Sequence, residues 1–429
     1  MNPVILIPTY VSARRLTGSD PILTSYDHTT PLSLKGELPR CLNSLRTVRG
    51  VGRIIVLVVS ERACAKQASE KVRQIAERFP DLDISVVGAA EMAIIHQRLE
   101  QLGAPSKKEI NLTSYGAIRN VGMLLANVFN FDSLVFIDDD VVIDDPAFLE
   151  KAMYGLGKHT RRGVPILAKT GFYFNADNQY TAPHDTKWYN RFWSQTEFFN
   201  EWITQAMKSA RLTRSNYVCG GCMALHHEAF TRVSFDPWIT RGEDLDYMIN
   251  LRMYSGDMWF DNKWYMRHLP PTESVLSEGM RFRQDIFRWL YEFRKLEYGR
   301  TQIDLHPVKP ASLQPYPGPF LDAGVQKRIK RTARLRSFGC PDGRGYRRAA
   351  QAATGDALRY AEENCSRYFE FQYKWPTIMS RISNDPVLQQ ALAGIAVQAP
   401  QRVAQMRSQM PNLDPGVTTE IRLNLGDRD

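Results

Sequence analysis

Three consecutive carboxylates, Asp138, Asp139 and Asp140, follow an apolar run in the sequence "SLVFIDDDVVIDD". Like charges this close repel one another, so the cluster is unfavourable unless a cation or hydrogen-bond donors offset it. Oxygen ligands suit Mg²⁺ or Mn²⁺, which usually bridge one or two carboxylates to substrate phosphates. In an extended stretch, Asp138 and Asp140 point to one side and Asp139 to the other. We therefore expect Asp138 and Asp140 to share one metal site.

A structural role is the alternative for this acidic stretch. Asp144 and Asp145 precede Pro146, and acids in that position are typical of a turn that caps a following helix. The triplet itself fits a cap less well, because it directly follows a buried strand.

Hydrophobic patterning predicts the elements that position the cluster. Short apolar runs rich in β-branched residues alternate with amphipathic segments through the first 140 residues. This alternation is typical of an α/β fold with a mostly parallel central sheet and helices on both faces. The cluster then lies past the carboxyl end of a buried strand, the edge where open α/β sheets bind ligands. We expect strands over residues 4–8, 52–60, 83–88 and 133–138.

Composition divides the chain into three parts. After residue 150 the pattern is mixed, with a helix expected to start near Glu243 and a strand to end at His268. Five prolines within residues 307–319 predict a linker, and the segment beyond it is basic and helical in pattern. We expect a catalytic domain over 1–300 (nucleotide-binding half about 1–145, acceptor half about 146–300), a linker over 301–320, and a basic helical C-terminal extension over 321–429 with a disordered tail.

Overall composition excludes several classes of protein. Of 429 residues, 43% are hydrophobic and 24% are charged, which is typical of a soluble globular protein. Six scattered cysteines are too few for a disulfide framework and indicate a reducing compartment. The start "MNPVILIPTYV" lacks a charged n-region, and no apolar run approaches the roughly 20 residues that span a bilayer. We expect a cytoplasmic protein that is at most peripheral to a membrane.

Positive charge is concentrated in the C-terminal part. The net charge is +9, and residues 321–350 carry nine Lys or Arg against two Asp. Such a segment is either a solvated helix face or a patch for a phosphate-bearing partner, such as a nucleic acid, an anionic lipid or a phosphorylated acceptor. We place the candidate anionic partner at Lys327–Arg348.

Four segments, in order, resemble a GT-A fold glycosyltransferase of family 2, a family that uses nucleotide sugars. The sequence "VILIPTY" resembles its first strand and nucleotide loop, and "GAIRNVGMLLAN" with "SLVFIDDDVV" resembles its helix and aspartate-x-aspartate signature. "GGCMALHHEAF" resembles the acceptor-side strand, and "FDPWITRGEDLDYMINLRMYSGDMWF" the segment with a glutamate–aspartate signature. The resemblance spans roughly residues 3–270 and implies a Rossmann-like GT-A domain with hexosyltransferase activity.

The resemblance also implies roles for individual residues. Asp140 would bind a Mn²⁺ or Mg²⁺ ion directly, and Asp138 would bind the metal or the ribose of the donor. His268 stands where similar enzymes place a third metal ligand, and imidazole suits ions such as Mn²⁺. Glu61 stands where the family often has a base-contacting aspartate, which is a departure from the pattern. The other donor-binding candidates are Pro8, Thr9, Tyr10, Arg119 and Asp139.

The sequence "RGEDLD" contains the candidate catalytic acids. Transfer of a sugar to a hydroxyl needs a base that takes the hydroxyl proton. By resemblance, Asp244 is that base and Glu243 binds or orients the acceptor. The alternative is that both acids only cap the helix that follows. With Asp244 as base, a single displacement favours inversion. The donor implied is a UDP- or GDP-sugar, and the acceptor a hydroxyl on a glycan, a lipid-linked or small molecule, or a polyanionic polymer.

Other interpretations stay open. A nucleotidyltransferase of similar architecture carries a Gly-rich basic loop after its first strand, which "IPTYVSARRLTGSD" imitates weakly. A haloacid-dehalogenase-like phosphatase would use Asp138 as its nucleophile, but that motif normally ends the first strand of its domain. A nucleic-acid or membrane binder would act through the basic segment. The sequence "CGGC" at 219–222 is more typical of an acceptor wall than of a zinc or redox site.

Overall fold

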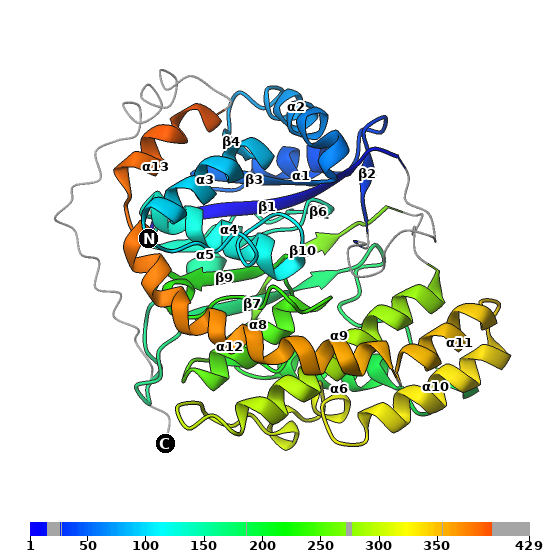
Figure 1. The fold of residues 1–429 in the computed structure, drawn as a ribbon. Coiled ribbons are helices and arrows are strands. Elements are labelled where there is room, and N and C mark those ends of the chain that lie inside the picture. Colours follow the sequence, from blue (N-terminus) through cyan, green and yellow to red (C-terminus); the bar gives the residue numbers. More distant parts are fainter. Residues whose placement is uncertain (15–25, 27, 186, 272–276, 354, 397–429) are drawn as a thin grey trace.

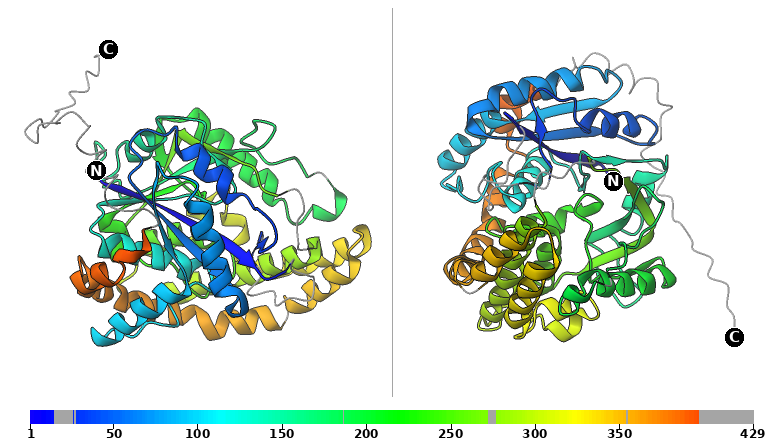
Figure 2. Two further views of the ribbon diagram at one scale, coloured as in Figure 1. Left: turned by 90° about the horizontal axis from the view of Figure 1, so that it is seen from above. Right: turned by 90° about the vertical axis from the view of Figure 1, so that its right-hand side faces the viewer.

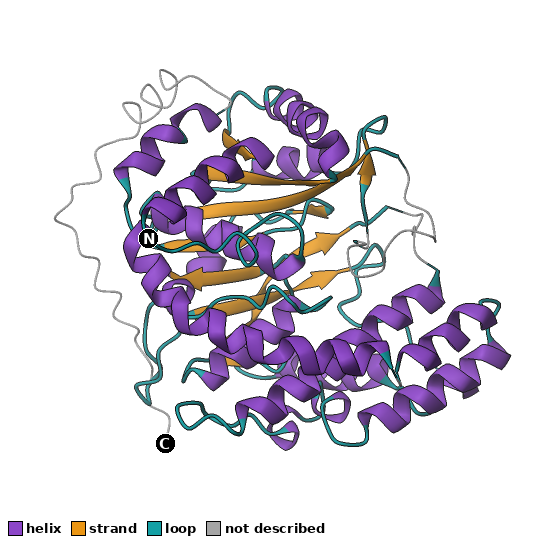
Figure 3. Cartoon of the chain, in the orientation of Figure 1, coloured by secondary structure: helices purple, strands orange, loops and turns teal. Residues whose placement is uncertain are grey.

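The computed structural model describes residues 1–14, 26, 28–185, 187–271, 277–353 and 355–396. These residues form a single mixed sheet with helices on both faces, which confirms the α/β class (Figures 1 and 3). The tail expected to be disordered lies outside the described residues. Within the described ranges, no helix combines the length and apolar character needed to cross a lipid bilayer.

Ten strands make up the described sheet. They are β1 (Pro3–Ser12), β2 (Thr30–Pro31), β3 (Arg53–Ser60), β4 (Asp83–Val87), β5 (Ser133–Phe136), β6 (Val141–Val142), β7 (Ala168–Phe174), β8 (Leu212–Arg214), β9 (Met223–His226) and β10 (Met258–His268). All four strands expected in the first 140 residues are present, and the strand expected to end at His268 does so.

Strand order places the acidic cluster at a sheet edge. The order is β4-β3-β1-β5-β9-β7-β10-β6, with β2 beside β1 and β8 beside β10. Strands β4, β3, β1 and β5 are parallel, whereas β9 runs antiparallel between β5 and β7. The carboxyl ends of β1 and β5 therefore lie side by side, and the residues after β5 emerge there.

Helices cover both faces of the sheet. They are α1 (Leu38–Leu45), α2 (Ala65–Ala76), α3 (Ala89–Gln101), α4 (Tyr115–Val128), α5 (Phe148–Met153), α6 (Gln195–Lys208), α7 (His227–Arg232), α8 (Glu243–Met253), α9 (Glu278–Gly299), α10 (Val325–Gly339), α11 (Gly343–Ala352), α12 (Asp356–Ile382) and α13 (Pro386–Ala391). Short 3₁₀ helices lie at Arg62–Cys64, Trp188–Asn190, Pro310–Leu313, Gly318–Phe320 and Ala393–Ile395.

Alternation along β1 divides the core into two layers. Val4 and Leu6 pack in one cluster with α3, α4 and the helices from α6 onward, whereas Ile5 and Ile7 pack with α1, α2 and α5. Successive side chains of a strand point to opposite faces, so an uninterrupted apolar run is what a strand with two covered faces requires.

The C-terminal helices pack against the rest of the chain. Helix α12 runs beside α9 and also contacts α4 and α7, and α10 and α11 lie side by side (Figures 1 and 2). The proline-rich segment expected as a linker is also packed, since Leu313, Tyr316 and Phe320 are buried in the larger core. The boundaries of catalytic domain, linker and extension stay a prediction.

Candidate active site

Asp138 lies just past β5 and is held by two neighbours. The phenol of Tyr173, on β7, donates a hydrogen bond to Asp138 Oδ2 at 2.8 Å. Arg119, on α4, donates from Nη2 to Asp138 Oδ1 at 3.3 Å. About a third of the Asp138 side chain (36%) is exposed, so the carboxylate is oriented and yet accessible to a ligand.

Asp139 contacts the first strand. Its carboxylate accepts a hydrogen bond from Thr9 Oγ1 on β1. The pKa of Asp139 is raised to about 8. Burial is the largest cause, the charges of Asp140 and Asp138 also raise the pKa, and the Thr9 hydrogen bond lowers it. At neutral pH a proton on Asp139 thus relieves part of the repulsion within the triplet. The donor-binding roles of Thr9 and Asp139 stay predictions.

Asp140 is paired with His268 across two antiparallel strands. Strand β6 pairs with β10 so that His268 lies opposite Val141, and His268 Nε2 is 3.1 Å from Asp140 Oδ2. Burial lowers the pKa of His268, but the hydrogen bond and charge of Asp140 outweigh it and the net pKa is raised. The imidazole also stacks on Tyr173, with ring centroids 4.9 Å apart. The structure therefore brings together two of the three predicted metal ligands, which lie 128 residues apart in the sequence.

The chemistry of this pair fits a divalent cation. Asp140 Oδ1 is buried and has no hydrogen-bond partner among the described residues, and carboxylate with imidazole is a donor set that Mn²⁺ accepts. In the described ranges, no three His, Cys, Asp or Glu side chains are grouped so as to hold a metal ion. Asp140 and His268 would therefore hold a cation together with substrate oxygens and water, as is common for Mg²⁺. The metal roles of Asp138, Asp140 and His268 stay predictions.

The helix with the second acidic motif begins at Glu243, as the sequence predicts. Gly242 precedes it with φ +71°, a left-handed conformation that glycine adopts without steric cost. A Cβ at Gly242 would overlap the guanidinium of buried Arg288, so close packing requires glycine there too. The chain can thus turn sharply into Glu243 and Asp244 with α9 directly behind it.

Asp244 contacts Gly220, the first of two glycines that precede β9. Its Oδ2 accepts the backbone N–H of Gly220 at 3.0 Å, and its Oδ1 accepts the N–H of Leu245 at 2.7 Å. A Cβ at Gly220 would lie 3.2 Å from Asp244 Oδ2, and one at Gly221 would overlap the carboxylate of Asp138. The glycines therefore let one stretch of backbone approach both acidic motifs.

Arg119 joins the two motifs. It donates from Nη2 to Asp138 and from Nε to Glu243 Oε1, each at 3.3 Å, and it lies over the Phe136 ring. The pKa of Glu243 is raised to about 7. Burial is the largest cause, the charge of Asp244 also raises the pKa, and the charge of Arg119 lowers it. Arg119 Nη1 is buried and has no hydrogen-bond partner in the described part of the chain. The guanidinium thus links Asp138 to Glu243 and keeps one buried nitrogen without a partner among the described residues.

Tyr10 lies in an aromatic cluster next to the site. Its ring centroid is 4.3 Å from that of Tyr26 and 5.8 Å from that of Tyr115. Burial raises the pKa of Tyr10, so the phenol stays neutral. Pro8 is buried in β1 opposite Leu57. The roles of Pro8 and Tyr10 in a nucleoside pocket stay predictions.

Glu61 follows the end of β3, where Ser60 lies opposite Val11 of β1, and its donor-binding role stays a prediction. Its side chain is exposed, and in the described structure it shares no hydrogen bond or ion pair with the other candidate residues. Sequence reasoning did not single out Tyr173, Tyr26, Tyr115 or Arg288. Nothing local marks these residues, because their contacts come from strand order and from helices far away in the chain.

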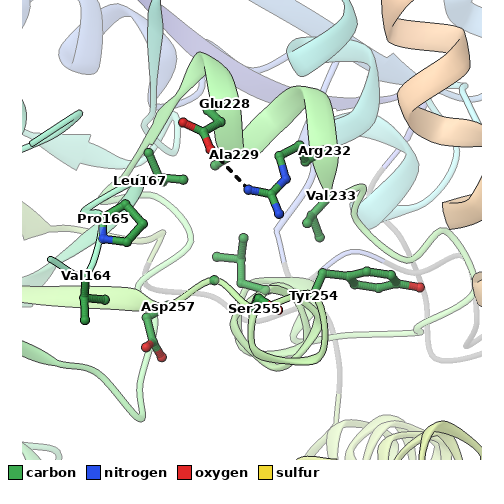
Figure 4. Close-up of a pocket in the computed structure, with 12 residues that line it drawn as sticks. Val164, Pro165, Leu167, Glu228, Ala229, Arg232, Val233, Tyr254, Ser255 and Asp257 are labelled. Atoms are coloured by element: carbon green, nitrogen blue, oxygen red, sulfur yellow. Dashed lines mark hydrogen bonds and ion pairs between the residues drawn. The ribbon is translucent and has the colours of Figure 1, made fainter. Parts of the chain in front are cut away.

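A small hollow of about 20 Å³ lies at the opposite edge of the sheet, before the start of β7 (Figure 4). Glu228 and Arg232 form an ion pair of 3.2 Å on its wall, and Val164 and Pro165 line another side. None of the predicted site residues lines it. Its volume is that of about one water molecule, so it carries no functional interpretation.

The sheet with one acidic motif after β5 and another at the start of α8 defines an α/β enzyme of the GT-A class. The sequence matches the family model "Glycosyltransferase like family 2" over residues 35–291, well over half of the chain. The chain therefore belongs to glycosyltransferase-like family 2, and the protein is a glycosyltransferase. This membership replaces the nucleotidyltransferase and phosphatase interpretations. No curated protein matches the chain in sequence.

Solved structures resemble the chain distantly. A mannosyltransferase, PcManGT, from Pyrobaculum calidifontis in complex with GDP-Man and Mn²⁺ is 14% identical, with 90% of this chain and 86% of that chain covered and a TM-score of 0.40. GalNAc-T7 with UDP, GalNAc and Mn²⁺ is 11% identical, with 87% and 58% covered and a TM-score of 0.38. A mycobacterial protein is 14% identical, with 66% and 72% covered and a TM-score of 0.34. Similarity this low carries no argument about donor or metal.

Proposed function

We propose that the protein transfers a sugar from a UDP- or GDP-sugar to a hydroxyl acceptor in a metal-dependent reaction that inverts the anomeric carbon. The observation that carries this proposal is the pair of hydrogen bonds from Arg119 to Asp138 and Glu243, which unites the two motifs in one site. Arg119 Nη1 and Asp140 Oδ1 lack partners among the described residues, so this site keeps one buried donor and one buried acceptor for ligands.

On the donor side, Asp140 and His268 would hold Mn²⁺ or Mg²⁺, and Asp138 would bind the same ion or the donor ribose. When bound, the cation supplies electrostatic stabilisation of the departing nucleoside diphosphate. Tyr173 keeps Asp138 and His268 in fixed positions, because it donates to the first and stacks on the second. Tyr10, with the rings beside it, offers an aromatic surface for the planar base.

On the acceptor side, Asp244 takes the proton of the acceptor hydroxyl as its oxygen attacks the anomeric carbon. The new C–O bond forms as the bond to the diphosphate breaks, which inverts the configuration. The N–H groups of Gly220 and Leu245 orient the Asp244 carboxylate. Glu243, held by Arg119, orients the acceptor beside it.

Exposed positive charge supports a phosphate-bearing partner, and free thiols support a reducing compartment. The exposed cations within Lys327–Arg348 suit a phosphate-bearing partner, because the described residues give several of them no counter-ion. All six cysteines are free, which supports the proposal of a reducing, cytoplasmic compartment.

A thermal-shift series tests the proposal. The protein is heated with each nucleoside diphosphate, with and without Mn²⁺, because a ligand that binds the native state raises the melting temperature by mass action. We expect one nucleotide to give a rise of several degrees only with Mn²⁺, and Asp140→Ala to lose it. A wild-type protein that responds to no nucleotide with Mn²⁺ would contradict the proposal.

A further inference from the structure

A hollow of about 630 Å³ lies between α10 and the segment that precedes α6. Of its eight lining residues, none is acidic and five are cationic. We call this hollow the basic groove, and its cations are Arg191, Lys327, Lys330, Arg331 and Arg334. Its volume lies in the range of ligand-binding clefts.

Helix α10 presents its cations to the groove as one row. Lys327, Lys330, Arg331 and Arg334 follow the spacing i, i+3, i+4 and i+7, which places them on a single helix face. All four side chains are exposed. The row is about 10 Å long at 1.5 Å per residue, so it can contact more than one anionic group of a chain that runs along it.

Phe192 orders the guanidinium groups on the floor of the groove. Arg191 Cζ lies 4.8 Å and Arg331 Cζ lies 5.3 Å from the centroid of the Phe192 ring. A guanidinium held over an aromatic ring has lost part of its rotational freedom before a ligand arrives. The planar fork that it presents matches the geometry of phosphate oxygens.

The other cations of α10 are already occupied. Arg328 pairs with Asp322 at 2.8 Å, and Arg336 donates from Nε to Asn190 Oδ1 at 2.7 Å. Among the described residues, Lys327, Lys330 and Arg334 form no ion pair, so their charges repel one another without compensation. A bound polyanion would remove this repulsion.

The walls of the groove are joined to each other and to the acceptor half. The hydrogen bond from Arg336 to Asn190 ties α10 to the 3₁₀ helix Trp188–Asn190, which leads directly to Arg191 and Phe192. That segment continues from β7, whose Tyr173 contacts Asp138. A concave groove fits an extended chain, whereas a flat bilayer surface would favour a convex basic face.

We propose that the basic groove binds a phosphate-bearing stretch of the acceptor and so holds a polymeric acceptor on the enzyme. This inference rests on the proposed glycosyltransferase function. It narrows the site predicted for an anionic partner at Lys327–Arg348 to the α10 part of that segment. The exposed arginines of α11 are then expected to be dispensable for binding.

A matched pair of variants tests the groove with inorganic polyphosphate as the probe. The first combines Lys327→Gln, Lys330→Gln and Arg334→Gln. The second combines Arg344→Gln, Arg347→Gln and Arg348→Gln on the exposed face of α11 and removes the same charge. We expect at least a 10-fold weaker Kd for the groove variant and less than a 3-fold change for the α11 variant. The slope of log Kd against the logarithm of the salt concentration should also fall by about 2, and only for the groove variant.

Other outcomes would overturn the inference. Equal losses in the two variants would show that only net charge matters. In another outcome, the wild type binds phosphatidylglycerol vesicles and not polyphosphate. If only the groove variant then loses vesicle binding, the surface is assigned to a membrane. The nucleotide-dependent thermal shift is measured in both variants and should match that of the wild type. If the wild type shows no such shift, the acceptor assignment fails, even where polyphosphate binds.

Discussion

At the scale of single residues, Glu243 gives the site a pH dependence. Its pKa is about 7 against an ordinary value of 4.5, so it ionises only as the pH rises through neutrality. The ionised form pairs with Arg119, and the protonated form weakens that pair. We therefore expect kcat/KM to increase as the pH rises from 6 to 8, as measured in a pH–rate profile.

Two variants separate the roles of the adjacent acids. Glu243→Gln should lower kcat/KM and remove the rise near pH 7, because no ionisation is left at that position. Asp244→Asn should lower kcat by about 10²-fold or more at every pH, as expected for the loss of a general base. A rise near pH 7 that persists in Glu243→Gln would assign it to another group.

Gly221 should be intolerant of a side chain. A Cβ there would overlap the carboxylate of Asp138 and the phenol of Tyr173, so Gly221→Ala must displace one of them. We expect kcat/KM to fall at least 10-fold while the melting temperature changes by a few degrees. Gly52→Ala is the matched control, because the nearest atom to its Cβ would be Pro3 O at an ordinary 3.8 Å. Equal activity of the two variants would contradict the close approach.

At the scale of elements, Lys295 fixes α9 to α8. Its Nζ lies 2.7 Å from Asp236 Oδ2 and 2.7 Å from Asp246 Oδ1, and all three side chains are buried. Lys295→Met would leave two buried carboxylates without their cation. We expect a loss of about 3–5 kcal/mol in the free energy of unfolding, measured by urea denaturation.

A double variant provides the control for this clamp. Lys295→Met combined with Asp246→Asn removes one of the stranded charges, so it should regain part of the lost stability. An unchanged stability in Lys295→Met would show that α8 is held by apolar packing alone.

Local patterns predicted the elements well, and they failed where contacts are non-local. The strands near β1, β3, β4 and β5 and the start of α8 follow from apolar runs and from an acidic turn after glycine, which are visible in a short window. The sequence also indicated that Asp140 and His268 belong together, but only by resemblance. The bond from Tyr173 to Asp138 and the packing of Arg288 against Gly242 depend on strand order and helix placement, which no local pattern encodes.

At the scale of the whole molecule, α12 contributes buried side chains to the core. Trp375 is fully buried and donates from Nε1 to Phe230 O at 2.9 Å, and Gln372 accepts the N–H of Ser234 at 2.7 Å. Loss of α12 would expose these groups together with the faces of α4 and α9 that it covers.

Truncation tests this dependence and the predicted boundaries. A chain of residues 1–353 should aggregate or lack a cooperative thermal transition, because burial of several large side chains is lost. A chain of residues 1–396, which keeps the described helices, should unfold as the full chain does in circular dichroism. If the chain of residues 1–353 melts at the full-length temperature, the core forms without α12 and α13.

Arg119 donates to both Asp138 and Glu243, so in the proposed mechanism one side chain contacts the donor-binding acid and the acceptor-orienting acid. On that mechanism, a donor that takes up Asp138 would free the guanidinium to tighten on Glu243, and the acceptor pocket would be completed only after the donor has arrived. Binding in a compulsory order would follow, and it would have a chemical benefit. Water is an ever-present rival nucleophile, and an enzyme that readies its base late wastes little activated sugar by hydrolysis.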